Sequence, residues 1–404
     1  MRAAGIIVEY NPFHNGHLYQ VKKIRHELHP DVLIAVMSGD FTQRGEPAII
    51  SKWQRTKMAL AAGVDLIIEL PYIYAVGRAD TFAGGAVALL SHLKVSHLVF
   101  GSELGRIAPF LNSIEQVKNH RKLYQDALAA ALSQGISYPN AHAAAYQAVI
   151  SESGSEFVDL RQPNNSLGFH YIQAIHRNKS SMVPVTFKRK EAGHNDAAFD
   201  PDASIASASS IRRCLFSGST LEQLRGKLPE TSLSLLIEEK KKGRLVDWET
   251  FFPYLKYRIL SSSADQLGQI VEAEEGVENR LLKYIGQSET FEQFLSLVKT
   301  KRYTWVRIQR LCTHILTHTL KSEAKEAAVQ QPAYLRLLGM SATGQHYLSE
   351  LRKSFAIPLI AKIRQHHPEE LTPDLRAAQI YDFLSGRSGE TPTETGHPPV
   401  RYGS

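Results

Sequence analysis

Short apolar runs alternate with longer segments of helical spacing over the first half of this chain. The apolar runs predict strands at Ala3–Val8, Val32–Met37, Leu66–Leu70, His97–Phe100 and Met182–Phe187. Between them, the spacing of apolar residues predicts helices at Leu18–Leu28, Trp53–Ala62 and Thr81–Leu93 and near residues 110–134, 140–152 and 166–178. The strands are apolar on both faces, as in a parallel sheet that is covered on each side by helices. Residues 1–218 are therefore predicted to form a doubly wound α/β domain.

From about Leu215 onward the pattern is helical, and no further strand is expected. The predicted helices are Leu221–Arg225, Ser232–Lys242, Phe251–Ser261, Ala264–Glu275, Asn279–Ile285, Thr290–Thr300, Thr304–Leu320, Ala333–Leu338, Gly344–Arg352, Ile357–His366 and Asp374–Ser385. Residues 219–385 are thus predicted to form a second, all-α domain. The last residues, 386–404, are rich in Gly, Pro, Thr and Ser and predict a flexible tail.

The composition narrows the class of protein without identifying it. With 43% hydrophobic and 22% charged residues, the 404-residue chain has an ordinary globular composition, and its two cysteines exclude a disulfide framework. The sequence has neither the pattern of a signal peptide nor a run of about 20 apolar residues that would span a membrane, so we expect a cytoplasmic protein. The net charge of +7 is divided almost evenly between the two halves and does not by itself indicate a nucleic-acid partner.

The first predicted strand leads directly into Asn11-Pro12-Phe13-His14-Asn15-Gly16-His17, where a helix is expected to open. In an open parallel sheet, ligands bind at the carboxyl ends of the strands, where helix N-termini present free N–H groups. His14 and His17 lie three residues apart, so two imidazoles can point the same way and stabilise charge on one phosphate. Two other interpretations remain: a metal site, which lacks further Cys or His ligands nearby, and a turn with surface histidines. The dinucleotide-binding fingerprint and the P-loop are both absent.

A second polar motif, Ser207-Ala208-Ser209-Ser210-Ile211-Arg212, lies at the end of the predicted α/β domain. Ser209 or Ser210 is expected to cap a helix. Serine hydroxyls, free N–H groups and Arg212 or Arg213 suit the phosphates that leave as pyrophosphate. Plain helix capping is the alternative interpretation. Further polar loops, at residues 38–47, 100–103, 161–166 and 188–190, are expected at the same edge of the sheet.

One stretch of the predicted helical domain concentrates positive charge. Lys299–Arg310 contains five basic residues, no acidic residue and the aromatic residues Tyr303 and Trp305. Basic side chains neutralise phosphates and aromatic rings stack on unpaired bases, so this basic stretch is a candidate RNA-binding surface. A basic helix start with Trp305 in the core explains the same composition. A second basic run, Lys240–Arg244, suits a solvated helix end.

Several of these motifs resemble those of a known family. His14-Asn15-Gly16-His17 resembles the H-x-G-H signature of the nucleotidyltransferase superfamily, and Ser207–Arg212 resembles its serine-rich phosphate motif. The chain is similar to the bacterial tRNA(Met) cytidine acetate ligase family over nearly its whole length, in the strings Gly5–Gln20, Ser38–Lys52, Glu69–Pro71, Val99–Glu103, Pro163–Asn165 and Lys301–Arg310. The resemblance implies a Rossmann-like nucleotidyltransferase domain with a parallel sheet, followed by an all-α C-terminal domain.

The resemblance also implies a two-step reaction. Acetate attacks the α-phosphate of ATP, giving acetyl-adenylate and pyrophosphate, and the acetyl group then passes to the wobble cytidine of elongator tRNA(Met), forming N4-acetylcytidine. ATP is the expected cosubstrate, with Mg²⁺ on its phosphates, and no tightly bound cofactor or protein metal site is expected. The expected partners are acetate and elongator tRNA(Met), with no membrane and no obligate protein partner.

The site residues follow from the same resemblance. The expected catalytic residues are His14 and His17. ATP binding is implied for Ile7, Val8, Glu9, Tyr10, Asn11, Pro12, Phe13, His14, Asn15, Gly16, His17, Leu18, Tyr19, Gln20, Gly101, Asn164, Asn165, Arg189, Ser209 and Arg212. The candidate tRNA-binding residues are Lys301, Arg302, Tyr303, Trp305, Arg307 and Arg310. Asp40 stands where the family is expected to have Asn, and this carboxylate is expected to face away from the polyphosphate or to meet Mg²⁺ or Arg44.

Two functions of other classes stay open at this point. One is an adenylyltransferase for a phosphorylated metabolite, which needs only the α/β half and leaves the helical half and the basic stretch without a role. The other is a non-catalytic RNA-binding protein that keeps an inactive nucleotide fold, against which the intact His14, Gly16, His17 and Arg212 speak.

Overall fold

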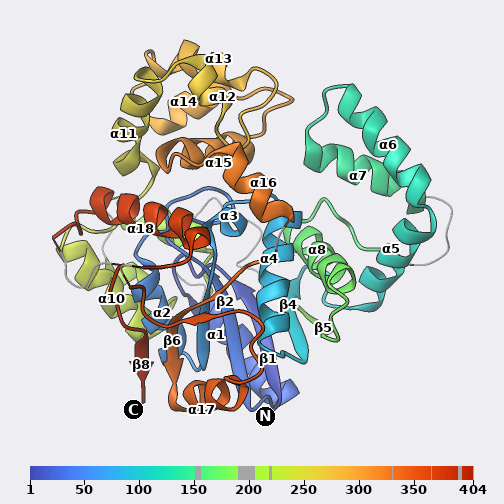
Figure 1. Ribbon diagram of the computed structural model, residues 1–404, viewed down its shortest axis with the longest axis vertical. Coiled ribbons are helices and arrows are strands. Elements are labelled where there is room, and N and C mark those ends of the chain that lie inside the picture. Colours follow the sequence, from blue (N-terminus) through green and yellow to red (C-terminus); the bar gives the residue numbers. More distant parts are fainter. Residues whose placement is uncertain are drawn as a thin grey trace.

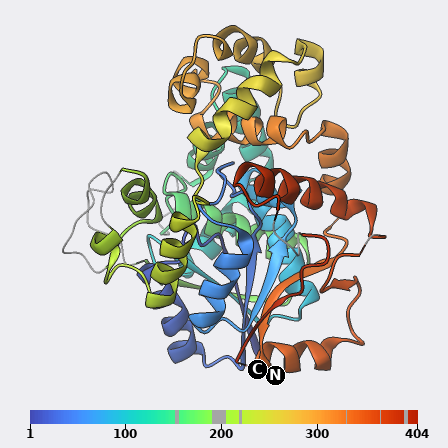
Figure 2. The same ribbon diagram turned by 90° about the vertical axis from the view of Figure 1, so that its left-hand side faces the viewer.

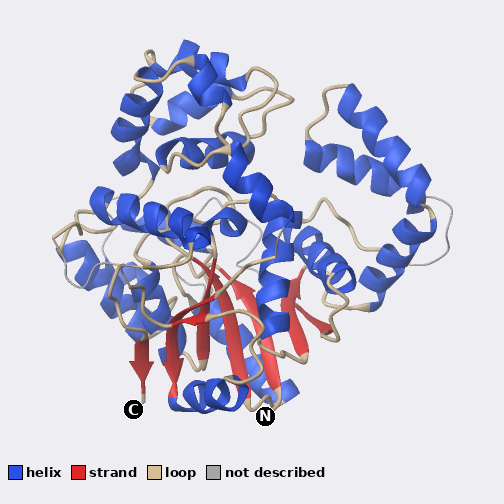
Figure 3. Cartoon of the chain, viewed as in Figure 1, coloured by secondary structure: helices blue, strands red, loops and turns tan. Residues whose placement is uncertain are grey.

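The computed structural model describes residues 1–150, 156–189, 205–217, 221–329, 331–364, 366–389 and 394–403. Within them, eight strands form one sheet in the order β5–β4–β1–β2–β3–β6–β7, with β8 paired to β6 (Figure 3). The first five strands are parallel: β1 (Ala3–Val8), β2 (Val32–Ser38), β3 (Leu66–Leu70), β4 (His97–Ser102) and β5 (Val183–Lys188). The predicted parallel sheet is therefore confirmed, and all five predicted strands exist.

Helices cover both faces of the sheet because alternate strand residues point to opposite sides. Ile34 and Val36 of β2 belong to one apolar core, with α4 (Ala79–His92), α8 (Pro163–Arg177) and α17 (Ala342–Leu351). Leu33 and Met37 belong to the other, with α1 (Asn15–Leu28), α2 (Lys52–Ala61), α9 (Ala208–Phe216) and α10 (Glu230–Lys241). This is the predicted doubly wound arrangement.

A second set of helices stands above the carboxyl edge of the sheet (Figures 1 and 2). It comprises α11 (Trp248–Leu260), α12 (Ala264–Gly268), α13 (Val277–Ile285), α14 (Phe291–Val298), α15 (Trp305–Leu316), α16 (Lys321–Val329) and α18 (Thr372–Leu384). Their core also contains Phe41, Tyr72 and Val76, which follow β2 and β3. The helical region therefore rests on the edge where the parallel strands end.

A helical arm is inserted in the chain between β4 and β5. It is formed by α6 (Arg121–Ser133) and α7 (Tyr138–Ile150), which follow α5 (Ala108–Asn119) and pack against each other. Figure 1 shows this arm on the opposite side of the carboxyl edge from α12 to α15. Three short elements complete the described helices: α3 (Tyr72–Ala75) and the 3-10 turns at Leu221–Leu224 and Glu369–Leu371.

The prediction of a helix at Ala333–Leu338 is wrong, because this segment enters the sheet. Residues Leu335–Ser341 form β6, which pairs antiparallel with β3. Leu335, Leu337 and Leu338 are all buried, on the two faces of the sheet. A short run that is apolar on both sides does not distinguish a buried strand from a buried helix, which explains the error.

The C-terminal part departs from the all-α prediction in two more places. The helix predicted at Ile357–His366 is not formed in the described residues; Leu359–Ile360 is the short strand β7 instead. The predicted flexible tail contains strand β8 (Val400–Tyr402), which pairs with β6, and the buried Glu394, which forms ion pairs with Lys52 and Arg336. The ion pairs of Glu394 and the pairing of β8 with β6 thus give these residues a defined structure, although their composition predicts a flexible tail. The predicted domain boundary at residues 218–219 lies outside the described residues.

Candidate active site

The polar loops that the sequence singles out converge at the carboxyl edge of the sheet. The loop after β1 carries the histidine motif, the loop after β2 carries residues 39–47, and Glu103 and Arg189 directly follow β4 and β5. Parallel neighbours bring these ends together, and the helical region closes over the same edge.

His14 and His17 are fixed by the start of α1. His14 is the N-cap residue, and its Nδ1 accepts the Gly16 N–H at 3.0 Å; the Nδ1 of His17 accepts the His14 N–H at 3.2 Å. The two rings stack with centroids 3.8 Å apart. Because both Nδ1 atoms accept hydrogen bonds, each neutral ring carries its proton on Nε2. Neither Nε2 has a partner among the described residues, so the pair presents two N–H donors.

Both imidazoles are held in the neutral form. Burial, with the positive charges of Arg189 and Arg212, lowers the pKa of His14 to about 3. Burial also lowers the pKa of His17 well below its usual value, helped by His14 and Arg189. The same interactions show that the arginines predicted for ATP binding, Arg189 and Arg212, lie near the histidines. Both rings are therefore neutral in the neutral pH range.

Close packing explains the residue types around the histidines. A Cβ at Gly16 would lie 2.8 Å from the His14 Cε1 atom, so only glycine lets this ring fold back over the helix start. Tyr10 and Phe13 pack against the His17 ring with centroids 4.8 and 5.5 Å away. These contacts restrict rotation of the His17 side chain.

The serine motif lies beside the histidine motif, as predicted. The α9 helix carries Arg212, which donates to the Asn11 carbonyl oxygen and to the Glu46 carboxylate, both at 2.8 Å. The N-cap is Ser207, whose side chain accepts the Ser210 N–H, and not Ser209 or Ser210 as predicted. Ser209 is exposed in the first turn of α9. Its hydroxyl is therefore not committed to capping.

The remaining predicted ATP residues form a second cluster around Glu103. The Glu103 carboxylate accepts hydrogen bonds from the backbone N–H groups of Asn164 and Asn165 at the start of α8. The Asn164 side chain accepts from Arg189 at 2.7 Å. A Cβ at Gly101 would lie 2.9 Å from the Arg189 Cγ, so the arginine crosses directly over this glycine. The structure thus brings Gly101, Asn164 and Arg189 together.

Two buried cations of α2 hold the strand ends in place, although no functional role is predicted for either of them from the sequence. Arg55 donates to the carbonyl oxygens of Glu9, Ser38 and Gly39. Lys52 forms ion pairs with Asp40, Glu69 and Glu394, and its backbone N–H donates to Asp40. Asp40 therefore meets Lys52 rather than Arg44, which is exposed.

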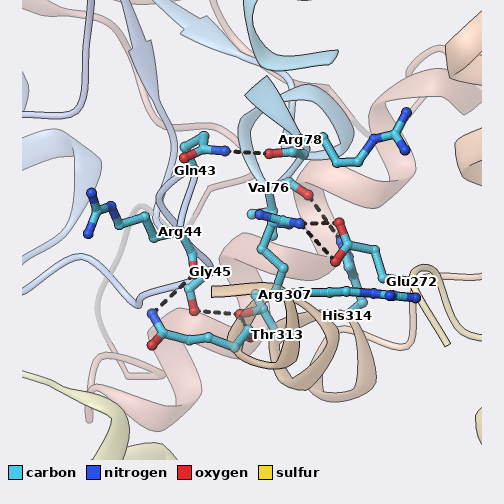
Figure 4. A network of polar contacts seen from close by, with 12 residues as sticks. Gln43, Arg44, Gly45, Val76, Arg78, Glu272, Arg307, Thr313 and His314 are labelled. Carbon is cyan, nitrogen blue, oxygen red and sulfur yellow. Dashed lines mark hydrogen bonds and ion pairs between the residues drawn. The ribbon is translucent and has the colours of Figure 1, made fainter. Parts of the chain in front are cut away.

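The loop after β2 connects this edge to the helical region (Figure 4). The Gly45 carbonyl oxygen accepts hydrogen bonds from Trp248 and Thr313, and Gln309 donates to the Arg44 carbonyl oxygen. Gly45 has φ +74°, and a Cβ there would lie 2.6 Å from the Arg310 backbone. Helix α15 therefore packs directly on a loop of the candidate site.

The six predicted tRNA-binding residues divide into two groups. Tyr303 and Arg310 are buried: Tyr303 donates to the Glu275 carbonyl oxygen, and Arg310 forms a two-point pair with Glu272 at 2.7 and 3.1 Å. Trp305 is half-buried against the helical core, and Arg307 is paired with Glu274 and Glu275. Lys301 and Arg302 are exposed, and neither forms an ion pair within the described ranges. Only these two present unpaired charge.

The described residues contain neither a cluster of metal ligands nor a long apolar helix. No group of three or more His, Cys, Asp or Glu side chains there is placed to hold a metal ion. No helix in that part of the chain is both long and apolar enough to cross a membrane.

Known proteins resemble this chain along its whole length. A family model described as HIGH Nucleotidyl Transferase matches residues 1–394. The tRNA(Met) cytidine acetate ligases of Bacillus licheniformis and Bacillus subtilis are 45% and 42% identical, with 100% of this chain and 98% of each relative covered. Crystal structures of Thermotoga maritima TmcAL, apo and bound with alpha-thio ATP, are 31% identical and have TM-scores of 0.90 and 0.88 over 100% of both chains.

Proposed function

This chain belongs to the tRNA(Met) cytidine acetate ligase family of HIGH nucleotidyl transferases, and we propose that it acetylates the wobble cytidine of elongator tRNA(Met) with acetate and ATP. The observation that carries the proposal is the pair of stacked, neutral histidines whose Nε2–H groups are unpaired among the described residues. Such a pair suits a phosphate that gains charge during nucleotidyl transfer.

In the first step, an acetate oxygen attacks the α-phosphorus of ATP, and the bond from this phosphorus to the bridging oxygen of pyrophosphate breaks. Acetate is a weak nucleophile, so the rate depends on positioning and on stabilising the charge of the α-phosphate. His14 and His17 donate their Nε2–H groups to α-phosphate oxygens. Arg212, Arg189 and the first turn of α9 at Ser209 hold the phosphates that leave.

Mg²⁺ enters as the ion bound to the ATP phosphates, where it neutralises charge on the leaving pyrophosphate. The side chains that face the phosphates in this proposal are cations and hydrogen-bond donors. The reaction takes place in the cytoplasm, where ATP and tRNA are found.

In the second step, the N4 amine of the cytidine attacks the acetyl carbonyl carbon of acetyl-adenylate. The bond from this carbon to the phosphate oxygen breaks, AMP leaves and N4 loses a proton. The RNA approaches from the helical region, because α15 packs on the loop after β2 beside the adenylate. Lys301 and Arg302 contribute exposed positive charge to that region.

A pulse–chase assay tests the proposal. The protein is incubated with labelled acetate and ATP, and tRNA(Met) or its wobble C→U variant is then added. We expect labelled acetyl-adenylate first and labelled tRNA second, and only when the wobble cytidine is present. Adenylate without RNA transfer would indicate another adenylyltransferase, and RNA binding without adenylate would indicate a non-catalytic protein; either result rejects the proposal.

A further inference from the structure

The turn between α6 and α7 faces two exposed arginines that come from distant parts of the chain. The turn contains Gly135 and Ser137 and leads into Tyr138, the first residue of α7; the arginines are Arg78 at the start of α4 and Arg302 of the basic stretch. In Figure 1 the arm formed by α6 and α7 stands beside the helical region above the carboxyl edge. These five residues are called the arm site below.

Arg302 links the basic stretch to the arm. A Cβ at Gly135 would lie 3.0 Å from the Arg302 Nη2 atom, and Gly135 has φ +74°, so its backbone suits glycine. The Arg302 side chain is exposed and forms no ion pair within the described ranges. Its positive charge at the turn is therefore not neutralised by a neighbouring carboxylate.

Arg78 approaches the same turn from the sheet. Its guanidinium lies 4.6 Å from the centre of the Tyr138 ring, a distance typical of a cation–π contact. Half of its side chain is exposed, and one nitrogen lies 3.3 Å from an Asp80 carboxylate oxygen. The planar group keeps further N–H donors for a ligand, since it has five in all.

Ser137 provides a polar group with no partner at this position. It is 4% exposed and directly precedes α7, a helix of 13 residues. Its hydroxyl has no hydrogen-bond partner, so it does not cap the helix. The first N–H groups of an α-helix are left without intrahelical partners and favour anions; in α7 they belong to Tyr138 and Asn140, because Pro139 has no N–H. The Ser137 hydroxyl is an unused hydrogen-bond donor one residue before this helix start.

The arm site is also connected to the candidate active site. The Gln43 backbone N–H donates to the Glu9 carboxylate at 2.7 Å, and the Gln43 side chain donates to the Gly77 carbonyl oxygen at 2.8 Å. Gly77 directly precedes Arg78, whose side chain points away from Gln43 in Figure 4. The start of α4, which carries Arg78, is therefore joined through Gln43 to the residue that follows β1.

We propose that the arm site binds a backbone phosphodiester of the RNA substrate, with Arg78, Arg302 and Ser137 as its donors. This inference rests on the proposed function and adds a second RNA contact to it. The arm and the basic stretch then hold the RNA from two sides of the carboxyl edge. Two cations and a helix N-terminus recognise a phosphate without reading a base, so the contact sets affinity and register rather than sequence.

Variants of Arg78 and Ser137 test the arm site without touching the basic stretch. For Arg78→Gln we expect the Kd for tRNA(Met) to rise about five- to tenfold, and the slope of log K against log salt to fall by about one. Arg78→Lys keeps the charge and recovers part of the affinity. Ser137→Ala raises Kd about twofold to threefold. Arg352→Gln, an exposed arginine at the C-terminal end of α17, is the matched control and keeps the wild-type Kd and slope.

Pyrophosphate released in the first step is the other phosphate group that the arm site would attract. A second measurement distinguishes pyrophosphate binding from RNA binding. If the site takes RNA, the KM for pyrophosphate in ATP–pyrophosphate exchange is the same in Arg78→Gln and wild type. A raised KM with an unchanged Kd for tRNA would overturn the inference, as would wild-type affinity and salt slope in both Arg78→Gln and Ser137→Ala. Failure of the proposed function is distinct, since wild-type protein would then form no acetyl-adenylate or no acetylated tRNA.

Discussion

The edge of the sheet that carries His14 and His17 uses polar groups in a different way from the basic stretch Lys299–Arg310. At the edge, backbone hydrogen bonds occupy one nitrogen of each histidine and leave the other as a donor. In the basic stretch, two of the five cations, Arg307 and Arg310, are used in ion pairs with neighbouring glutamates. The first region leaves hydrogen-bond donors unused, whereas two of the five cations of the second stabilise the fold.

The difference lies in what each pattern determines. The H-x-G-H spacing determines a local backbone geometry, namely a capped helix start. This geometry in turn determines where the two histidine side chains point. A count of basic residues fixes no geometry, and their neighbours decide whether they face solvent. Glu272, Glu274 and Glu275 lie some 30 to 40 positions away in the sequence from the arginines that they pair with.

The largest effect is expected at the histidine pair. His14→Ala and His17→Ala each remove one donor to the α-phosphate, and we expect acetyl-adenylate formation to fall about 10²- to 10³-fold. ATP–pyrophosphate exchange measures this step directly. His26→Ala, at an exposed position on the same helix, is the control and keeps the wild-type rate. Near-normal exchange in both His14→Ala and His17→Ala would remove the pair from the mechanism.

The next effect is on folding rather than on activity. Arg310→Ala leaves the Glu272 carboxylate, which is 13% exposed, without its partner, and we expect the free energy of unfolding to fall by about 3 kcal/mol. Arg307→Ala is the matched variant and loses less than about 1 kcal/mol, because Glu274 and Glu275 are exposed. Denaturant unfolding measures both. Equal losses would contradict the division of the basic stretch into buried and exposed parts.

A smaller effect is expected at Lys301 and Arg302, the two residues of the basic stretch that are exposed and form no ion pair within the described residues. The charge reversal Lys301→Glu/Arg302→Glu should raise the Kd for tRNA(Met) on the order of tenfold, with a weaker salt dependence. Filter binding at several salt concentrations gives both quantities. Because neither side chain forms an ion pair within the described residues, the midpoint of unfolding should stay close to the wild-type value. Unchanged tRNA affinity would exclude these two residues from the RNA surface.

The smallest effect is the pH dependence of stability. The folded-state pKa of His14 is about 3 and its ordinary value is about 6.5, so the unfolded chain binds the proton more readily. Stability is therefore complete above pH 6.5 and falls as the pH drops toward 3, by about 1.4 kcal/mol per pH unit for this one group. His14→Asn keeps an acceptor at the N-cap and should reduce the slope by that amount between pH 6 and 5. Parallel curves for the two proteins would contradict the lowered pKa.

How far the sequence predicts this molecule depends on the range of the contacts involved. The strands β1 to β5 and the histidine motif follow from local pattern, since each is specified within about ten consecutive residues. Strand β6 is not predicted, because Leu335–Ser341 becomes a strand only by pairing with β3, far away in the sequence. The ordering of Glu394 depends on Lys52 and Arg336 in the same way.

The same difference between local pattern and long-range contact applies within the candidate site. Gly16, Arg189 and Arg212 are named from the sequence, and all three lie close to His14 in the structure. Arg55 is missed, since an arginine that binds three strand-end carbonyl oxygens has no signature in its own helix. Tyr303 is predicted as a stacking residue but is buried, since its hydroxyl donates to Glu275 rather than facing solvent.

Supplying acetyl-adenylate that has been prepared chemically tests most directly whether activation and RNA binding reside in separate regions. In the presence of this compound and tRNA(Met), His17→Ala should acetylate the tRNA at close to the wild-type rate, because the step that needs the histidine has been bypassed. Lys301→Glu/Arg302→Glu should remain impaired under the same conditions, because its defect is in RNA binding. Failure to restore His17→Ala, or full recovery of the charge-reversal variant, would contradict this division.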